Sequence, residues 1–416
     1  MNWPAAAFAA LLVLGLLTAL ELGLRALVRS LRRDCQWLIT KADETPAFEP
    51  QALRKFLAGS FDPELGWVRK PNSEGVEKGA RGEIVFRIDD RGARVDGGSH
   101  DRSPIAAAFG DSYVFGRQVE DGETWAAELG RLLGGEVANF GVGNYGADQG
   151  LLRYERTPLP EGMRWVILGF VPETICRVQS YWKHYLEFGN TFAFKPRFEL
   201  DAAGTLVLVP SAMAGSEDFA ALAGKLDYIR RHDGFYRRKF RALQFRGSYL
   251  LSLLSRPGRQ FELIAAAWRR RLGAMGPEPF ALVVRRNIRE AHALYGEEAS
   301  RQLLRAILLR FAESARRRGH EPLLVVFPQL FDLKAGEDSS RAYRKFFAEL
   351  GREVPLLDLT AVLHGDDVDA LYVEDAYGGH LSAFGNAVAA RALAERLAAA
   401  CAVRGEPGQS AAESYV

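Results

Sequence analysis

A serine, a glycine-rich segment and a histidine occur in this sequence beside apolar runs that are typical of buried strands. Ser112 closes the tripeptide Gly-Asp-Ser, which directly follows the apolar run Ile105–Phe109. The glycine-rich segment Asn139–Gln149 comes next, and His380 lies far along the chain, before a helical pattern. A serine hydroxyl becomes a useful nucleophile when a neighbouring base takes its proton. These residue types therefore suit acyl-transfer chemistry, with Ser112 as nucleophile and His380 as base.

Such chemistry needs two further kinds of group. A carboxylate should hold the histidine in the useful tautomer, and Asp375 is the candidate, with Glu374 beside it. The developing oxyanion needs hydrogen-bond donors, which the amide of Ser112 and the amides of the turn 141–144 can supply. The candidates for the oxyanion and substrate-binding positions are Gly141, Asn144, Thr174, Glu173 and Arg177.

The elements around these residues alternate between strands and helices. Five apolar runs predict strands at 105–109, 136–140, 165–170, 323–327 and 355–359. Amphipathic patterns predict helices at 125–133, 149–156, 297–318 and 382–399. This alternation predicts a parallel sheet covered by helices on both faces. In an open parallel sheet, ligands bind outside the carboxyl ends of the strands, so Ser112, the glycine-rich turn and His380 should meet at one edge.

Three segments resemble the conserved blocks of the SGNH (GDSL-type) hydrolases. Ala108–Gly116 (AFGDSYVFG) is similar to the first block, NFGVGNYG (139–146) to the second, and GGHLSAFGN (378–386) to the last. The resemblance covers roughly 105–175 and 320–400, and extends to bacterial membrane-anchored members. It implies a flavodoxin-like three-layer α/β sandwich with a five-stranded parallel sheet, Ser112 as nucleophile and His380 as base.

The sequence departs from the family pattern at three places. The second-block glycine is replaced by Asn144, whose backbone amide remains available. The third block, usually Gly-x-Asn-Asp, is GFVPET (169–174), so Thr174 stands as the alternative oxyanion donor. The acid that usually precedes the histidine by three residues is Tyr377, which leaves Asp375 as the nearest carboxylate. These departures keep open a catalytically decayed site.

The N-terminal residues 1–33 are predicted to be a membrane anchor. Trp3–Leu20 carries no charged side chain, and a membrane helix needs about 20 residues. Glu21 and Arg25 are spaced to pair on one helix face beyond that run. A cleaved signal peptide is the alternative, although it would favour a basic start and a small-residue cleavage site.

The rest of the chain divides by composition. Residues 34–104 read as a polar linker, to about residue 60, and a small β-rich lead-in; 105–175 and 291–403 form the predicted hydrolase domain; and 404–416 reads as a disordered tail. The insertion 176–290 combines a β-hairpin at 192–210 with a basic segment, 225–272, of 13 Lys/Arg against three acids. That segment suits a solvated helical face, anionic lipid headgroups or an acidic polymer.

These features favour an ester hydrolase over other classes. The net charge of +2 argues against a nucleic-acid binder, and three cysteines without a CxxC pair argue against a zinc site, so neither cofactor nor metal is expected. The resemblance implies an acyl-ester substrate, carbohydrate-linked and of the cell envelope. An O-acyltransferase and a decayed polysaccharide-binding protein are the alternatives.

The side of the membrane is left open by two opposing arguments. Arg25, Arg29, Arg32 and Arg33 all follow the apolar run, which by the positive-inside rule places the domain in the cytoplasm. The resemblance to enzymes that modify envelope polysaccharide favours the periplasmic, extracytoplasmic side, and we lean slightly to that side.

Overall fold

The computed structural model describes residues 3–34, 45–79, 82–98, 104–187, 189–274, 279–334, 337–364, 368–373 and 379–403. The predicted tail 404–416 and Asp375 therefore lie outside the described residues. The central element is a five-stranded parallel sheet with strand order β11-β10-β7-β5-β6. Its strands are β5 (Pro104–Gly110), β6 (Glu136–Gly141), β7 (Trp165–Phe170), β10 (Glu321–Val326) and β11 (Leu356–Asp358).

The predicted α/β class and the parallel sheet are confirmed. Each of the five apolar runs forms a strand. Most side chains of β5, β6, β7 and β10 are buried on both faces between two helical layers, whereas those of the edge strand β11 are half-buried. In order along the chain, the strands are arranged 2-1-3-4-5, which is the flavodoxin-like order. The second strand along the chain, β6, lies on one side of β5, and the later strands lie on its other side. At such a switch point a crevice forms outside the carboxyl ends of the strands.

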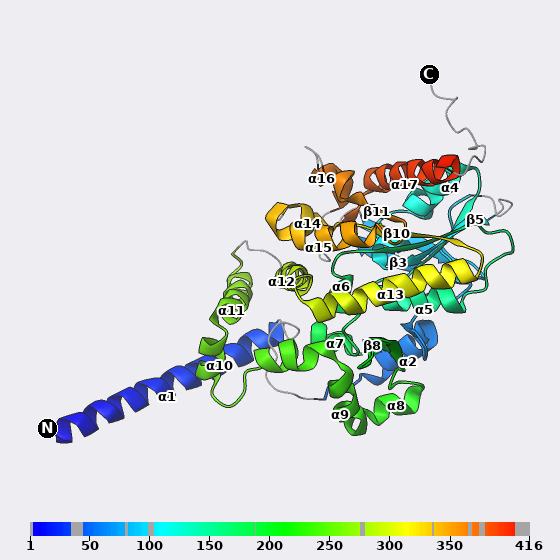
Figure 1. Ribbon diagram of the computed structural model, residues 1–416. Helices are drawn as coiled ribbons and strands as arrows, with labels where there is room; N and C mark the ends of the chain where they lie inside the picture. The colour runs from blue at the N-terminus through cyan, green and yellow to red at the C-terminus, as the bar shows by residue number, and fades with distance from the viewer. Residues whose placement is uncertain are drawn as a thin grey trace.

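Helices cover both faces of the sheet (Figure 1). On one face, α4 (Trp125–Leu133) and α17 (Ala383–Val403) pack on Ala106 and Ala108 of β5. On the other face, α5 (Ala147–Arg156) packs on Ala107 and Phe109 of β5, α13 (Glu298–Arg317) packs on β10, and α15 (Glu337–Leu350) packs on β11. Successive side chains of β5 therefore enter opposite layers of the core, as strand geometry requires.

The lead-in segment adds to the edge of the sheet. The hairpin β3 (Ser73–Gly79) and β4 (Gly82–Ile88) leads to Arg94, whose amide donates to the carbonyl of Asn139 in β6 at 2.7 Å. The buried Arg94 guanidinium donates to the carbonyls of Phe115, Gly116 and Val119. The lead-in thus fixes the chain that follows the first central strand. The short strands β1 (Phe61–Asp62) and β2 (Gly66–Trp67) pair antiparallel before it.

The predicted linker differs from the structure in one part. Residues Pro50–Gly59 form helix α2, with Glu49 accepting from the amides of Gln51 and Ala52 as an N-cap. The proline at the first helical position has a backbone angle already suited to a helix. Phe56 of α2 stacks on Phe192 of the insertion, with ring centroids 5.3 Å apart. This helix was not predicted, because the segment 34–60 as a whole has a polar composition.

The insertion begins close to the sheet, lies farthest from it in the helical segment 249–271, and returns to the body of the protein at its end (Figure 1). The predicted hairpin is present as β8 (Arg197–Leu200) and β9 (Leu206–Val209). The helices of 174–294 are α6 (Thr174–Arg177), α7 (Lys183–Leu186), α8 (Ser216–Ala220), α9 (Leu222–His232), α10 (Tyr249–Ser255), α11 (Pro257–Arg271) and α12 (Pro279–Leu294), with a π-helical turn at Tyr236–Phe240.

Helix α1 (Trp3–Asp34) extends away from the rest of the molecule (Figure 1). Among the described residues it is the one helix long and apolar enough to cross a membrane, over Trp3–Leu31. Its first 18 residues are exposed, whereas Val28 and Leu31 are buried against α10 and α11. The predicted pair of Arg25 Nε and Glu21 Oε1 is confirmed at 2.6 Å.

Candidate active site

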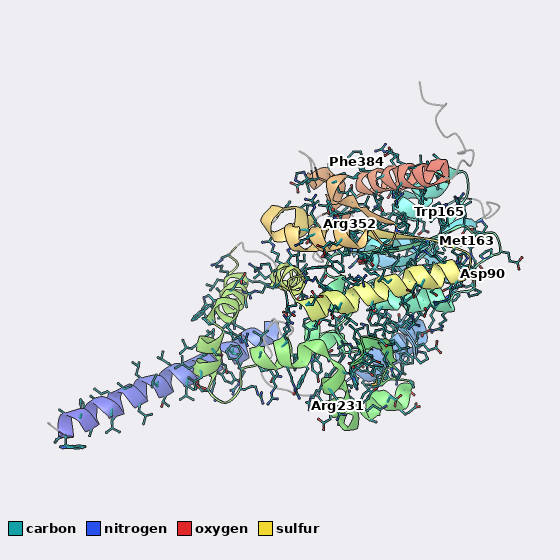
Figure 2. All side chains as sticks on the ribbon, in the orientation of Figure 1. Asp90, Met163, Trp165, Arg231, Arg352 and Phe384 are labelled. Atoms are coloured by element: carbon teal, nitrogen blue, oxygen red, sulfur yellow. The ribbon has the colours of Figure 1, made fainter. Side chains whose placement is uncertain are left out.

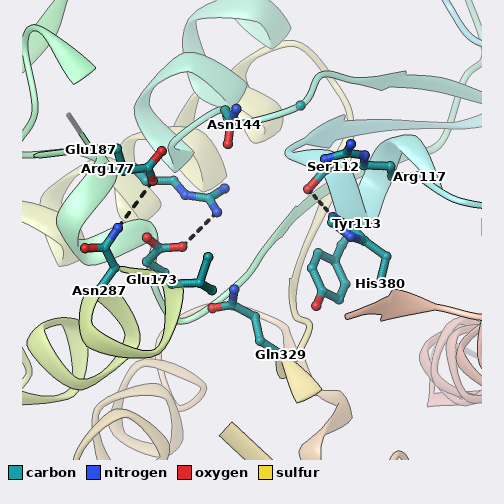
Figure 3. Close-up of a pocket in the computed structure, with 12 residues that line it drawn as sticks. Ser112, Tyr113, Arg117, Asn144, Glu173, Arg177, Glu187, Asn287, Gln329 and His380 are labelled. Atoms are coloured by element: carbon teal, nitrogen blue, oxygen red, sulfur yellow. Dashed lines mark hydrogen bonds and ion pairs between the residues drawn. The ribbon is translucent and has the colours of Figure 1, made fainter. Parts of the chain in front are cut away.

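Ser112 and His380 lie in contact, although 268 residues separate them. Ser112 is the first residue of the short helix α3 (Ser112–Phe115), immediately after β5. His380 is in β13 (His380–Leu381), which pairs antiparallel with β12 (Tyr372–Val373). The distance between His380 Nε2 and Ser112 Oγ is 2.8 Å, within hydrogen-bonding range (Figure 3). The switch point of the sheet therefore holds a serine hydroxyl and an imidazole in direct contact.

The turn that presents Ser112 depends on a close approach of two strands. Gly110 has a φ of 147°, and a Cβ there would lie 1.9 Å from the carbonyl oxygen of Gly169 in β7. The side chain of Asp111 then accepts from the amides of Tyr113, at 2.9 Å, and Val171, at 3.1 Å. Asp111 thus caps α3 and ties the end of β5 to the end of β7, which fixes the backbone of Ser112.

Tyr113 holds the strand that carries His380. Its hydroxyl donates to the carbonyl of Gly379 at 2.6 Å, and its ring centroid lies 4.9 Å from that of His380. Asp375, the carboxylate predicted to orient His380, belongs to the connection between β12 and β13, which lies outside the described residues. Its role therefore stays a prediction.

The candidates from the second block have different surroundings. Asn144 lines the pocket and has a φ of 68°, the left-handed conformation that glycine usually adopts. Gly141 lies beneath α3, where a Cβ would be 2.2 Å from the amide nitrogen of Phe115. The Gly141 amide donates to Asn139 Oδ1 at 3.0 Å. Gly141 thus permits close packing of α3 on β6, whereas Gly143 and Asn144 line the pocket.

Thr174 is fully buried next to the N-terminus of α5. Its hydroxyl oxygen accepts from the amide of Ala147 at 2.8 Å. This contact links the chain after β7 to the chain after β6. The structure therefore places the Thr174 hydroxyl on a backbone amide, whereas Asn144 lies in the pocket wall.

Arg177 joins three loops at the carboxyl edge of the sheet. Its Nη1 lies 3.3 Å from Asp111 Oδ2 and donates to the carbonyl of Tyr145 at 3.1 Å. Its Nη2 pairs with Glu173 Oε2 at 3.0 Å (Figure 3). Asp111, Tyr145 and Glu173 follow β5, β6 and β7, respectively. One buried guanidinium thus holds together the loops that surround Ser112.

Burial and neighbouring charges shift the pKa values of the groups in this cluster in opposite directions. Burial works to raise the pKa of Glu173, but Arg177 and Lys183 outweigh it, and the pKa lies below its ordinary value. Burial would lower the pKa of Arg177, but Glu173 and Asp111 raise it above its ordinary value. Burial raises the pKa of Asp111, although Arg177 opposes this. The closer carboxylate, Glu173, is therefore the main counter-ion of Arg177.

The pocket in front of Ser112 is mainly polar. It is lined by Ser112, Tyr113, Arg117, Gly143, Asn144, Glu173, Arg177, Glu187, Val284, Asn287, Gln329 and His380. Arg117 is held by Glu77 of the lead-in hairpin, with Nε and Oε2 3.2 Å apart. Asn287 Nδ2 donates to Glu187 Oε1 at 3.5 Å (Figure 3). The insertion therefore completes the pocket around Ser112 and His380, and the lead-in hairpin holds Arg117 in its wall.

Sequence reasoning missed four polar residues of this lining, namely Arg117, Glu187, Asn287 and Gln329. Gln329 follows β10, the fourth strand of the sheet, so its position at a strand end was a usable signal. The backbone amide of Gln329 donates to Asp332 Oδ2 at 2.7 Å, and Asp332 Oδ1 contacts His292 Nε2 at 2.7 Å. Glu187 and Asn287 lie in the insertion, where neither motif nor strand end marked them.

Among the comparisons with known proteins, the comparison with solved structures gives matches. Neither a protein-family model nor a curated protein matches the sequence. Among solved structures, the chain is similar to one described as "a putative lipolytic protein of G-D-S-L family from Desulfitobacterium hafniense DCB-2". The two share 13% identity with a TM-score of 0.33, over 70% of this chain and 98% of the other.

Proposed function

We propose that this chain is a serine ester hydrolase of the SGNH type. The observation that carries the proposal is the 2.8 Å contact between Ser112 Oγ and His380 Nε2 at the switch point of the sheet. In this mechanism His380 accepts the hydroxyl proton as Ser112 Oγ attacks the acyl carbonyl carbon. Asp375 is the proposed orienting carboxylate, because a third group is needed to hold the histidine ring.

The oxyanion would form in front of the Ser112 amide. This amide is at the first position of α3, where helix geometry leaves an N–H without an intrahelical acceptor. Asn144, in its left-handed conformation across the pocket, is the second proposed donor. Collapse of the tetrahedral intermediate breaks the ester C–O bond, and His380 returns its proton to the departing alcohol. Water then attacks the acyl-serine in the same way and releases the acid.

The lining supports a substrate with a small acyl group on a polar carrier. Val284 is the one aliphatic side chain among the twelve lining residues, whereas Arg117, Glu187 and Asn287 offer charges and hydrogen bonds. A long acyl chain would displace the water that solvates these polar groups, which is costly in a buried site. Hydroxyl-rich carriers can satisfy them, and we therefore propose an acylated carbohydrate.

Labelling with a fluorophosphonate probe tests the nucleophile. We expect stoichiometric labelling of the full-length protein and its complete loss in Ser112→Ala, with an unchanged unfolding midpoint. Ser180→Ala removes another buried serine hydroxyl and should label normally. Persistent labelling of Ser112→Ala would remove Ser112 from the mechanism. Because an acyl-enzyme can also pass its acyl group to a sugar hydroxyl, product analysis with and without saccharide separates hydrolysis from transfer.

We further propose that α1 anchors the protein in a membrane, with the catalytic domain on the extracytoplasmic side. The support is the exposed apolar surface of Trp3–Leu20 and the substrate class proposed above. A C-terminal alkaline phosphatase fusion in a bacterial host tests the side, because this phosphatase is active outside the cytoplasm. Strong phosphatase activity is expected. An inactive phosphatase fusion together with a fluorescent green-protein fusion would place the domain in the cytoplasm.

A further inference from the structure

The helix pair α10–α11 of the insertion exposes an unusual amount of apolar surface. Outside α1, twelve large apolar side chains of the described residues are exposed, and five of them lie between 251 and 272. They are Leu251, Leu254, Phe261, Trp268 and Leu272. Phe261 and Trp268 of α11 and Leu272, the residue that caps its C-terminus, are spaced by seven and four residues, so they lie on one side of the helix. A contiguous apolar face on a soluble surface indicates a binding partner.

This face is positioned beside the apolar helix α1. Glu21, the first charged residue after the apolar run of α1, accepts from the amides of Tyr249 and Leu250, each at 2.8 Å. Its carboxylate also accepts from the hydroxyl of Ser248 at 2.9 Å. The N-terminus of α10 is therefore held at the level where the apolar run of α1 ends. If α1 spans a bilayer, this level is the headgroup region.

A shared apolar cluster makes the arrangement rigid. Val28 and Leu31 of α1 pack with Tyr249 and Leu253 of α10 and with Ala266 and Ala267 of α11. Arg25 lies over the ring of Tyr249, with its guanidinium carbon 4.7 Å from the centroid. Figure 2 shows the side chains of the first half of α1 standing away from the body of the protein. The helix pair α10–α11 thus packs on the part of α1 that follows its exposed apolar run.

The charge of α10–α11 indicates what kind of partner its apolar face binds. Residues 246–272 contain six arginines, at 246, 256, 259, 269, 270 and 271, and one acid, Glu262. Arg269–Arg271 are exposed and directly adjoin Trp268. Tryptophan favours the membrane–water interface, and basic residues beside an apolar helical face favour anionic headgroups.

We propose that α10–α11 lies in the headgroup layer of the membrane that α1 crosses, with Trp268 and Leu272 inserted and Arg269 and Arg270 facing anionic lipid. This inference rests on the proposed membrane anchoring by α1, but the surface is separate from the Ser112 pocket, so it does not depend on the proposed activity. It makes the insertion a second membrane contact that fixes the orientation of the catalytic domain. Interfacial helices of this kind enter the bilayer by roughly 5–10 Å.

A depth measurement in nanodiscs tests the proposal. The full-length chain with Cys35→Ser and Cys401→Ser carries Trp268→Cys or Leu272→Cys, each labelled with an environment-sensitive fluorophore. The matched control is Val207→Cys on β9, because Val207 is 46% exposed and Trp268 45%. With lipids that carry a shallow nitroxide, the labels at 268 and 272 should lose most of their fluorescence and the label at 207 should not. Each variant is first checked for an unchanged unfolding midpoint, and Leu251→Cys replaces any that fails.

Two results would overturn the insertion of α10–α11. The first is that labels at 268 and 272 stay as bright as the label at 207 and remain open to aqueous iodide. The second is that they escape nitroxide lipid but are shielded from iodide, which means that protein covers this face. Either result leaves labelling of Ser112 unaffected, so failure here is distinct from failure of the proposed function.

The charge component has its own test. Quenching at 272 should increase when phosphatidylglycerol replaces part of the phosphatidylcholine, and the Arg269→Gln/Arg270→Gln variant should lose that dependence. Arg231→Gln/Arg237→Gln removes the same charge from an exposed part of the insertion before α10 and should retain the dependence. If the first pair of substitutions leaves the dependence on phosphatidylglycerol intact, these arginines do not face anionic lipid.

Discussion

The two sides of the pocket are built by different means. On the sheet side, Ser112 is fixed by backbone geometry, since Gly110 and the Asp111 cap leave its turn little freedom. On the insertion side, Glu187 and Asn287 come from the end of α7 and from α12, and they are held by side-chain contacts. A backbone constraint keeps the reacting atoms in place, whereas side-chain contacts can vary with the substrate. We expect substitutions on the first side to change turnover and those on the second to change binding.

We expect the largest loss of turnover from substitution of Asp375, the proposed orienting acid. Asp375→Asn is expected to lower kcat by roughly 10²–10⁴, because the wrong tautomer of His380 cannot accept the serine proton. Steady-state hydrolysis of p-nitrophenyl acetate measures it, with Glu374→Gln as the neighbouring control. A harmless Asp375→Asn beside a damaging Glu374→Gln would move the role by one residue. If both variants are harmless, Ser112 and His380 act without a carboxylate.

Arg177 joins the loops of the sheet side, and its loss should affect the fold. Arg177→Met leaves Asp111 and Glu173 buried without their shared cation, which should cost about 3–5 kcal/mol of unfolding free energy. Arg177→Lys keeps the charge but not the forked geometry, and should cost less. Denaturant unfolding measures both variants. Equal stability of the methionine variant and the parent would show that the loops do not need this link.

Substitution on the insertion side should change binding alone. Glu187→Gln removes the charge that faces Lys183 and Asn287, and KM for the natural substrate should rise roughly 3–10-fold with kcat little changed. Glu349→Gln, an exposed carboxylate on α15, is the control. A fall in kcat as large as that of Asp375→Asn would remove the distinction between the two sides.

The smallest effect concerns the attachment of the lead-in. Asp62 pairs with Arg156 of α5 at 2.7 and 2.9 Å, and although burial opposes it, the arginine and the Leu65 amide hold the pKa of Asp62 below its ordinary value. A carboxyl whose pKa is lowered by folding stabilises the protein at neutral pH. That contribution is lost as pH falls below about 4.

We therefore expect Asp62→Asn to cost about 1–2 kcal/mol at pH 7 and less at low pH. Turnover per folded molecule should not change, because Asp62 is remote from Ser112 in the contacts described. Unfolding at several pH values measures the effect, with the highly exposed Asp227→Asn as control. A cost that is constant with pH would contradict the role of the charge.

The sequence was sufficient where one local rule governs the structure. Each strand of the central sheet was predicted, because doubly buried strands require apolar runs, and the strand-end rule correctly brought Ser112 and His380 together. It was insufficient where partners are distant in the chain. Glu187 and Asn287 carry no local signal of their place in the pocket. Helix α2 was not predicted, because its apolar face is recognised only from its contact with the distant residue Phe192.

Glu21 has a consequence for how the chain is synthesised. Its carboxylate accepts a hydrogen bond from Ser248, the N-cap residue of α10, which lies 227 residues later in the sequence. At a synthesis rate of about 5–20 residues per second, roughly 10–45 s pass between the emergence of the two residues. During that interval the buried face of α1, with Val28 and Leu31, has not yet met the helices that cover it. The nascent chain must therefore keep this face protected, by the membrane or by a chaperone, until the insertion has been made.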